Sequence, residues 1–340
     1  MRPFRFERAG SVSDVAQLIA ETRTAQRPPV TAATQFIAGG TNLVDTMKLD
    51  VARPEVVVDL NGLGEADLHR IEATDTGIRF GALVRMAEAE QHEAVRSRYP
   101  VIAESLALAA SPQIRNMASL AGNLLQRTRC EYFRETTWPC NKRDPGTGCS
   151  AIGGHDRQHA VLGTSPHCIA TYPGDFAQAL IALDAMVEIE GGQGLRKIPV
   201  AELHRLPGDT PHIETLLNAG DLITAISVPA GPWTARSHFL KVRDRTSYAF
   251  ALASVAVALQ LEGETVHEAR IALGGVATVP WRATEAEAVL RGRTLDEQSA
   301  GMAAEAAFAG ARTGRHNAFK LDLGRAAVVQ ALMETKRMRL

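Results

Sequence analysis

All four cysteines of this 340-residue chain lie between residues 130 and 168. The segment that carries them is rich in glycine, proline and charged residues, so it has few apolar side chains with which to fold. Small domains that lack a hydrophobic core are commonly held in one conformation by disulfides or by metal–thiolate bonds. Three kinds of link therefore compete here: disulfides, a zinc site and an iron–sulfur cluster.

The spacing of the cysteines leaves these alternatives open. They are Cys130, Cys140, Cys149 and Cys168. The paired CxxC knuckles typical of zinc ribbons are absent, and so is the spacing of bacterial ferredoxins. Two disulfides need an oxidising compartment, and four unrelated thiols are the simplest alternative. Three histidines in the same window also keep a mixed Cys/His metal site open: His155, His159 and His167.

The composition argues against several classes of function. A formal net charge of −1 does not favour nucleic-acid binding, which needs a surplus of basic residues. No run of about eighteen apolar residues predicts a membrane span. Charged side chains in residues 1–10 predict that the chain has no signal peptide of its own, although a partner could carry one. With 45% hydrophobic residues, the chain can form two or three compact units.

Two turns of small residues suggest contact with a phosphate-bearing ligand. Residues 39–42 (GGTN) follow an apolar strand that begins at Phe36, and residues 119–123 (SLAGN) are similar in kind. Glycines let the backbone approach a ligand closely, and successive amides can bind phosphate oxygens. Neither turn has the Rossmann or P-loop pattern. Each alone is more often a plain turn, but the two together could close on one elongated cofactor.

Local patterns predict several elements. A cap at Ser11 or Ser13 starts a helix, and residues 27–34 form a proline-containing loop. A helix that begins near Tyr99 is expected to end at Pro112, because proline disfavours helical backbone in the residue before it. Residues 247–263 are ambiguous, since alanine and leucine favour a helix whereas the β-branched residues favour a strand. Further helices are expected over residues 283–292, 297–311 and 319–337.

Five motifs in one order, over nearly the whole chain, resemble the FAD-binding subunits of the xanthine dehydrogenase/aldehyde oxidase family of molybdenum hydroxylases. They are FIAGGTNLVDTMK, IRNMASLAGNLLQ, IATYPGDFAQALIALDA, FLKVRDRTSYAFALASVAV and ALGGVATVPWRA. The cysteine segment resembles an insertion that most members lack. It is similar to the insertion in flavin subunits of bacterial periplasmic aldehyde oxidoreductases and, less closely, of 4-hydroxybenzoyl-CoA reductases. In both groups the insertion carries a [4Fe–4S] cluster.

The resemblance implies an α+β fold in which two N-terminal subdomains bind FAD. This two-subdomain FAD-binding domain would be of the PCMH/vanillyl-alcohol-oxidase-like type. A C-terminal α+β domain of the CO dehydrogenase flavoprotein type would follow. The expected domains are residues 1–59, residues 60–230 with an inserted iron–sulfur loop over 124–170, and residues 234–340, with the boundary near the Pro/Gly linker at 229–232. In this fold, residues 247–261 form a strand.

The resemblance also implies the residues that hold the cofactors. FAD contacts are expected from Phe36, Ile37, Ala38, Gly39, Gly40, Thr41, Asn42, Leu43, Ser119, Leu120, Ala121, Gly122, Asn123, Asp175, Ile223 and Lys241. The four cluster ligands would be Cys130, Cys140, Cys149 and Cys168. Basic residues of the insertion are expected to offset the negative charge of the thiolate-bound cluster. These are Arg127, Arg129, Lys142 and Arg143.

The implied function is electron transfer in a heterotrimer. A large molybdenum-cofactor subunit would oxidise an aldehyde to a carboxylic acid. A small [2Fe–2S] subunit would pass the electrons to FAD on this chain, and an external acceptor would take them. An alternative is that the chain is the flavin subunit of a related hydroxylase that acts on an N-heterocycle or an aromatic CoA thioester. The competing classes are a stand-alone flavoprotein oxidoreductase and a zinc-stabilised scaffold subunit. The complex would be periplasmic, through co-export with a partner, or cytoplasmic.

Overall fold

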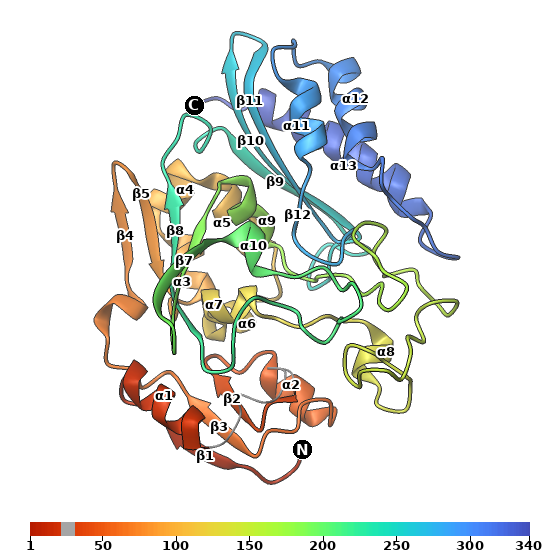
Figure 1. Cartoon of the computed structure of the whole chain (residues 1–340). Helices are drawn as coiled ribbons and strands as arrows, with labels where there is room; N and C mark the ends of the chain where they lie inside the picture. The colour runs from red at the N-terminus through yellow and green to blue at the C-terminus, as the bar shows by residue number, and fades with distance from the viewer. Residues whose placement is uncertain (22–30) are drawn as a thin grey trace.

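Three sheets, stacked along the length of the molecule, form the framework of the protein (Figure 1). The computed structural model describes residues 1–21 and 31–340, so part of the loop expected over residues 27–34 lies outside the described residues. Figure 1 places the N-terminal sheet at one end and the C-terminal sheet at the other, with the largest sheet between them. The fold is α+β, as the sequence predicts.

The N-terminal sheet has three parallel strands in the order β1-β3-β2. They are β1 (Arg5–Arg8), β2 (Thr34–Ile37) and β3 (Val56–Asp59). Helix α1 (Val12–Glu21) begins after Ser11, whose hydroxyl accepts the Asp14 amide at 3.2 Å, so Ser11 is the cap. Strand β2 runs directly into the GGTN turn and helix α2 (Leu43–Lys48). The turn therefore lies at the carboxyl end of a parallel strand.

The middle sheet has five antiparallel strands in the order β4-β5-β8-β6-β7. Its strands are β4 (Ile71–Thr74), β5 (Gly77–Gly81), β6 (Met186–Gly191), β7 (Gly194–Pro199) and β8 (Leu222–Pro229). The elements that accompany it are the 3₁₀-helix η3 (Ala66–His69) and helices α3 (Met86–Gln91), α4 (Glu93–Arg98), α5 (Pro100–Ala107), α6 (Pro112–Met117), α7 (Leu120–Leu124), α9 (Phe176–Ala182) and α10 (Val200–Leu203). Buried residues of this sheet and its helices form the largest hydrophobic core.

The prediction of one helix from near Tyr99 to Pro112 is wrong in its boundaries. Helix α5 already ends at Ala107, and Ala110 takes a left-handed conformation with φ 48°. Pro112 instead occupies the first turn of α6, where its missing N–H would lack an intrahelical partner anyway. The Ser111 hydroxyl caps this new helix by accepting the Ile114 amide at 3.4 Å.

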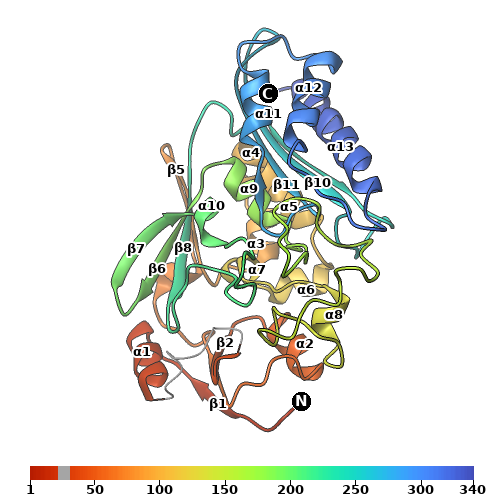
Figure 2. The same cartoon turned by 45° about the vertical axis from the view of Figure 1, so that its right-hand side comes forward.

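The C-terminal sheet is antiparallel in the order β12-β11-β10-β9, with three helices on one face (Figure 2). Its strands are β9 (Ser237–Val242), β10 (Ala253–Glu262), β11 (Thr265–Gly274) and β12 (Trp281–Arg282). The helices are α11 (Thr284–Leu290), α12 (Glu297–Ala307) and α13 (Phe319–Lys336), all three in predicted positions.

Strand β10 explains why residues 247–263 read ambiguously. Val255 and Val257 belong to the core beneath α11–α13, whereas Ala256 and Ala258 belong to the core of the middle unit. Both faces of the strand are buried, so large and small apolar residues alternate instead of apolar and polar ones. An alanine-rich strand of this kind lacks the usual period-2 signal. The strand implied by the resemblance is confirmed from Ala253 onward, whereas residues 247–252 lie outside it.

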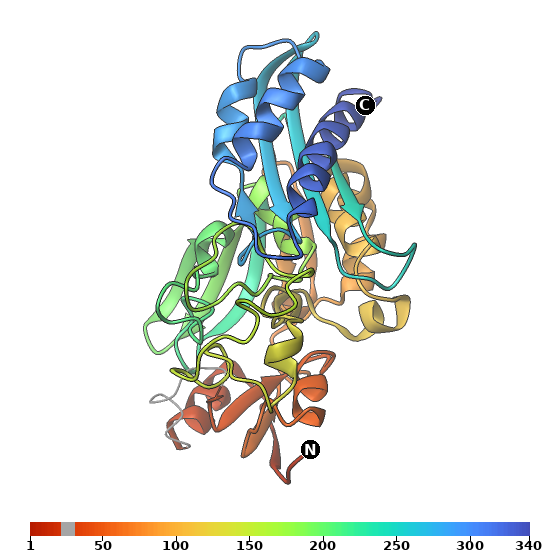
Figure 3. The same ribbon diagram turned by 90° about the vertical axis from the view of Figure 1, so that its right-hand side faces the viewer.

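The cysteine segment is a long loop on one side of the molecule. Figure 3 shows it running from the N-terminal unit, past helix α8 (Glu131–Arg134), towards the C-terminal helices. Between residues 125 and 175, all of which are described, α8 is the one helix or strand. Among the described residues, no helix is long and apolar enough to span a membrane.

Candidate functional site

A cavity of about 1050 Å³ lies where the three units and the cysteine segment meet. Its wall includes the GGTN turn after β2, the turn at the start of α7, and parts of the loop over residues 204–221. The loop over residues 244–250, which follows β9, also contributes. The two small-residue turns singled out in the sequence therefore line one cavity, although 76 positions separate Leu43 from Ser119.

The two turns are in backbone contact. A Cβ atom on Gly39 would overlap with the carbonyl group of Met117, so only glycine fits at this point. Arg85 donates to the Met117 carbonyl at 2.6 Å and to Asn61 Oδ1 at 2.7 Å. Asn61 in turn donates to the Ala38 carbonyl at 2.9 Å. Two side chains thus bracket the contact and fix the two turns relative to each other.

Several buried polar atoms around the cavity have no hydrogen-bond partner in the described part of the chain. They are Asn42 Nδ2, Asn123 Oδ1, Arg127 Nη2, Arg129 Nε, Asp175 Oδ1, His204 Nδ1 and His212 Nδ1. Buried polar groups in proteins are nearly always paired, so donors and acceptors left over in one large cavity are suited to a polar ligand. Gly40, with φ 71°, keeps the turn in a conformation that side-chain-bearing residues rarely adopt.

Asp175 and Lys241 form a buried ion pair in the wall of the same cavity. Lys241 Nζ lies 2.6 Å from Asp175 Oδ2 and also donates to the Leu108 carbonyl at 3.0 Å. Burial raises the pKa of Asp175, and the Lys241 ammonium opposes that rise. The second carboxylate oxygen of Asp175 is one of the unpaired atoms, so it can accept a hydrogen bond from a ligand.

Fifteen of the sixteen residues that the resemblance implied for FAD line this cavity. The exception is Leu120, whose side chain is fully buried in the core of the middle unit. Ser119 does line the cavity, but its hydroxyl also caps α7 by accepting the Gly122 amide at 3.3 Å.

A largely buried group of charges in the cavity wall, with side chains 12% to 22% exposed, was not predicted as part of this site. Glu214 lies 2.7 Å from Arg127 Nε and 2.9 Å from Lys142 Nζ. Burial alone would raise the pKa of Glu214, but the charges of Arg127 and Lys142 lower it to about 2. Arg127 follows the second small-residue turn by four positions, which is the one sequence signal that could have placed it here. Glu214 carries no such signal.

All four cysteines line a second, smaller cavity within the cysteine segment. Each has a free thiol, so the structure contains no disulfide between these four cysteines. Burial raises the pKa of Cys130 to about 12 and that of Cys168 to about 11, and it also raises the pKa of Cys140. Such thiols become thiolates only when a cation stands beside them. Within residues 1–21 and 31–340, no three His, Cys, Asp or Glu side chains are grouped so as to hold a metal ion.

The three histidines of the window lie at different places. His159 Nε2 is 3.1 Å from Cys130 Sγ, and His167 lines the small cavity. His155 does not line it; its ring packs against His316 with a centroid distance of 5.0 Å.

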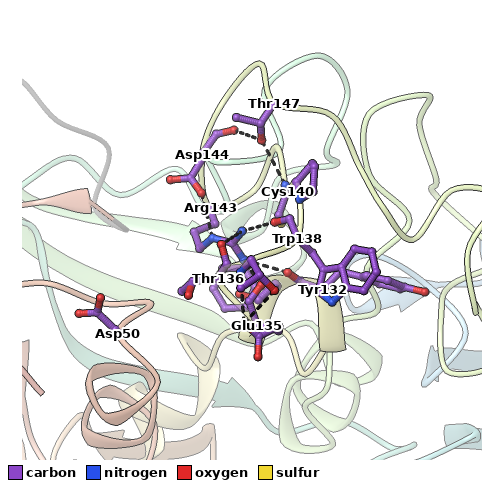
Figure 4. A network of polar contacts seen from close by, with 12 residues as sticks. Asp50, Tyr132, Glu135, Thr136, Trp138, Cys140, Arg143, Asp144 and Thr147 are labelled. Atoms are coloured by element: carbon purple, nitrogen blue, oxygen red, sulfur yellow. Dashed lines mark hydrogen bonds and ion pairs between the residues drawn. The ribbon is translucent and has the colours of Figure 1, made fainter.

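Arg143 organises the loop between the first two cysteines (Figure 4). Its guanidinium is buried and donates to several backbone carbonyls of the loop. The acceptors are the carbonyls of Tyr132 and Phe133 at 2.8 Å, of Glu135 at 3.1 Å and of Trp138. Its Nε also donates to the Asp144 carboxylate at 2.9 Å. Hydrogen bonds to one buried guanidinium therefore hold this part of the loop together.

The basic residues expected around a cluster divide into two pairs. Lys142 lines the cysteine cavity, where its charge lowers the pKa of Cys168, and Arg143 does the same for Cys140. Arg127 and Arg129 line only the large cavity, whereas Lys142 lines both. The charge expected from these two arginines thus acts mainly on the other site.

Comparison with known proteins identifies the family. The model of the FAD binding domain in molybdopterin dehydrogenase matches residues 2–231, and that of the CO dehydrogenase flavoprotein C-terminal domain matches residues 237–335. The chain belongs to the FAD-binding subunits of the molybdenum hydroxylases. The resemblance recognised in the sequence motifs is confirmed.

Members of this family resemble the chain over their whole length. The aldehyde oxidoreductase FAD-binding subunit PaoB of Escherichia coli (strain K12) is 46% identical over 338 residues, 99% of both chains. The carbon monoxide dehydrogenase medium chain of Afipia carboxidovorans is 28% identical, over 92% of this chain and 89% of its own. The structure of carbon monoxide dehydrogenase from Hydrogenophaga pseudoflava superposes with a TM-score of 0.73 at 25% identity, covering 98% of both chains.

The FAD-binding fold accounts for the large cavity. Its size, its small-residue turns and its unpaired polar atoms fit an elongated cofactor that carries both phosphates and a polar ring system.

We predict that Gly39→Ala lowers flavin occupancy more than Gly40→Ala. The first substitution places a methyl group against the backbone of Met117, which cannot give way, whereas the second meets flexible ends of Ile37 and Val44. Gly40→Ala still strains the backbone by about 1 kcal/mol because of its positive φ. Flavin released from purified protein measures the occupancy. Gly192→Ala, in open space, is the matched control, and full occupancy in Gly39→Ala would contradict the prediction.

We predict that Glu214→Gln destabilises the protein by about 3 kcal/mol at pH 7, because it leaves Arg127 and Lys142 buried without a counter-charge. The folded-state pKa of Glu214, about 2, lies below its ordinary value of 4.5. Its stabilisation is therefore complete above about pH 4.5 and is lost as the pH falls towards 2. Denaturant unfolding at several pH values should show the difference from wild type shrinking with acid. A difference that is independent of pH would contradict the assignment.

Proposed function

We propose that the chain is the FAD- and [4Fe–4S]-containing electron-transfer subunit of a molybdenum-dependent aldehyde oxidoreductase. It would take electrons from a [2Fe–2S] subunit and pass them to an external acceptor. The observation that carries this proposal is the 46% identity, over 99% of both chains, to an aldehyde oxidoreductase FAD-binding subunit. FAD, when bound, supplies the redox chemistry, and the chain's own residues bind, orient and shield it.

In this proposal the first turn and the second turn hold the pyrophosphate between them. The backbone amides of residues 39–42 and the free amide group of Asn42 are donors suited to phosphate oxygens. Asp175 offers its unpaired oxygen to a donor on the cofactor, and Lys241 fixes the orientation of that carboxylate. Ile223, on the wall formed by β8, supplies apolar contact. The remaining implied residues would line the path between these points.

The cysteine cavity supports the proposal of a [4Fe–4S] cluster bound by Cys130, Cys140, Cys149 and Cys168. A single zinc ion draws its ligands to one point at about 2.3 Å. A cubane cluster presents an iron at each of four corners, so its thiolates surround a volume instead of meeting at a point. The four free thiols line one cavity, and this shared lining is the observation that supports the cluster.

The proposed partners follow from the division of labour in the family. We propose a heterotrimer with a small [2Fe–2S] subunit and a large molybdenum-cofactor subunit, in which the aldehyde site belongs to the large subunit. The relatives are medium chains or FAD-binding subunits by name, which supports such an assembly. We further propose that the complex is loaded with cofactors in the cytoplasm and exported on a signal carried by a partner.

We predict that the complex, purified with its neighbours, contains one FAD per copy of this chain. It should also contain four iron and four acid-labile sulfide in addition to those of the [2Fe–2S] subunit. Cys140→Ser should remove the additional iron and sulfide and leave the [2Fe–2S] content unchanged. Chemical analysis and the visible spectrum provide the measurement. One zinc with no additional sulfide, or a colourless protein, would contradict the proposed function.

A further inference from the structure

Two arginines of the cysteine segment hold the helix that follows the first FAD turn. Asp45, on α2, lies 2.6 and 3.1 Å from the two terminal nitrogens of Arg134, and 3.0 Å from Arg129 Nη1. The hydrogen bond from Arg134, followed by the charges of both arginines, lowers the pKa of Asp45. The bidentate geometry with Arg134 fixes orientation as well as distance. Asp45 therefore links α2 to the cysteine segment through ion pairs.

Two further contacts join the same parts of the chain. The backbone N–H of Arg127 donates to Asn42 Oδ1 at 3.0 Å, so the segment also holds the last residue of the GGTN turn. On the other side of α2, Val51 packs in a small apolar cluster with Phe133 and Cys140. Charge, backbone and apolar contacts thus all run from the cysteine segment to the element that presents the first FAD turn.

Arg129 and Arg134 lie close in sequence to Cys130, a predicted cluster ligand. Arg129 immediately precedes Cys130, and Arg134 ends the short helix α8 that Cys130 starts. Fixing Cys130 therefore restrains the backbone that carries both arginines. The segment has few apolar side chains, so without bonds to its thiols it would lose order, and Asp45 would lose both partners.

We propose that the cysteine segment is a structural wall of the FAD site and that Asp45 couples the occupancy of the cysteine cavity to the affinity for FAD. This inference rests on the proposed function. A cluster bound in the cysteine cavity orders the cysteine segment, and this segment holds α2 and the GGTN turn. FAD then binds to a turn that already has its final conformation. By linkage, bound FAD raises the affinity of the cysteine cavity for the cluster by the same factor.

The ion pairs themselves contribute little to global stability. The side chain of Asp45 is 36% exposed and those of the arginines 25% and 27%, and ion pairs exposed to this extent have small net energies. Loss of Asp45 should therefore change the communication between the two sites more than it changes the stability of the fold. This separates a coupling residue from one that merely supports the fold.

The test is a double-mutant cycle on the native complex, with Asp45→Asn, Cys140→Ser and the double variant. Deflavinated complex is titrated with FAD to measure its dissociation constant, and iron and sulfide are measured in parallel. We expect Cys140→Ser to weaken FAD binding roughly tenfold in the wild-type background, and to have little effect in the Asp45→Asn background. Any direct contact of Asp45 with FAD would add to both arms equally and cancel in the cycle.

Asp50→Asn is the matched control. Asp50 also forms an ion pair near α2, with Arg2 at 2.8 Å, but not with the cysteine segment. In that background Cys140→Ser should still weaken FAD binding roughly tenfold. If Cys140→Ser weakens FAD binding equally in the wild-type and the Asp45→Asn backgrounds, or does not weaken it at all, the inference is wrong.

A second measurement avoids any change to a cysteine, in case Cys140→Ser does not fold. Iron release to a chelator is followed in complex with and without FAD. FAD should slow the release in wild type and have no effect in Asp45→Asn. A complex without flavin, or without the additional iron and sulfide, would contradict the proposed function. A complex that holds both but shows no mutual effect would contradict this inference alone.

Discussion

The contact between Gly39 and the backbone of Met117 is the constraint on which the rest of the site depends. It brings a turn of the parallel N-terminal sheet against the chain that enters α7, and so creates a cavity between two separately built units. Asn61 and Arg85 bond to the carbonyls on either side of this contact. Leu83 and Leu222 of the middle unit belong to the same hydrophobic core as Val58 of β3, so apolar packing also joins the two units beside the cavity.

The cysteine segment shows how a loop with little apolar surface can still be part of a rigid site. Arg143 pairs with the carbonyls inside the loop, while Asp45 and Glu214 bind its outward-facing cations. Asp156 completes the arrangement at the other end, where it accepts the amides of Arg315 and His316 ahead of α13. The segment is thereby tied to all three units, which gives the proposed cluster a position as well as a set of ligands.

Local patterns predicted those helices and strands in which each face meets a single environment, either the core or the solvent. The cap at Ser11 is of this kind, and so are the C-terminal helices. Prediction failed at Pro112, because the same residue can stop one helix or start the next, and the choice depends on the left-handed Ala110. It was undecided over β10, because burial on both faces removes the alternation of apolar and polar residues.

The site was predictable to the extent that it is written in local motifs. The two turns and Asp175 could be placed through the resemblance, and all reach the cavity. The partners of Asp175 and of the insertion arginines could not, because ion pairs such as Lys241–Asp175 join positions 66 residues apart. Glutamates such as Glu214 are common in loops, and only the fold shows that this one lies between two buried cations.

A cryo-electron microscopy map of the native complex tests the central claim most directly. The account predicts the FAD pyrophosphate between residues 39–42 and residues 119–123, in contact with Asn42. It also predicts cubane density among the four cysteines, with Arg134 still bonded to Asp45. Pyrophosphate density anywhere else in the chain, or a single-atom metal peak among the cysteines, would contradict it.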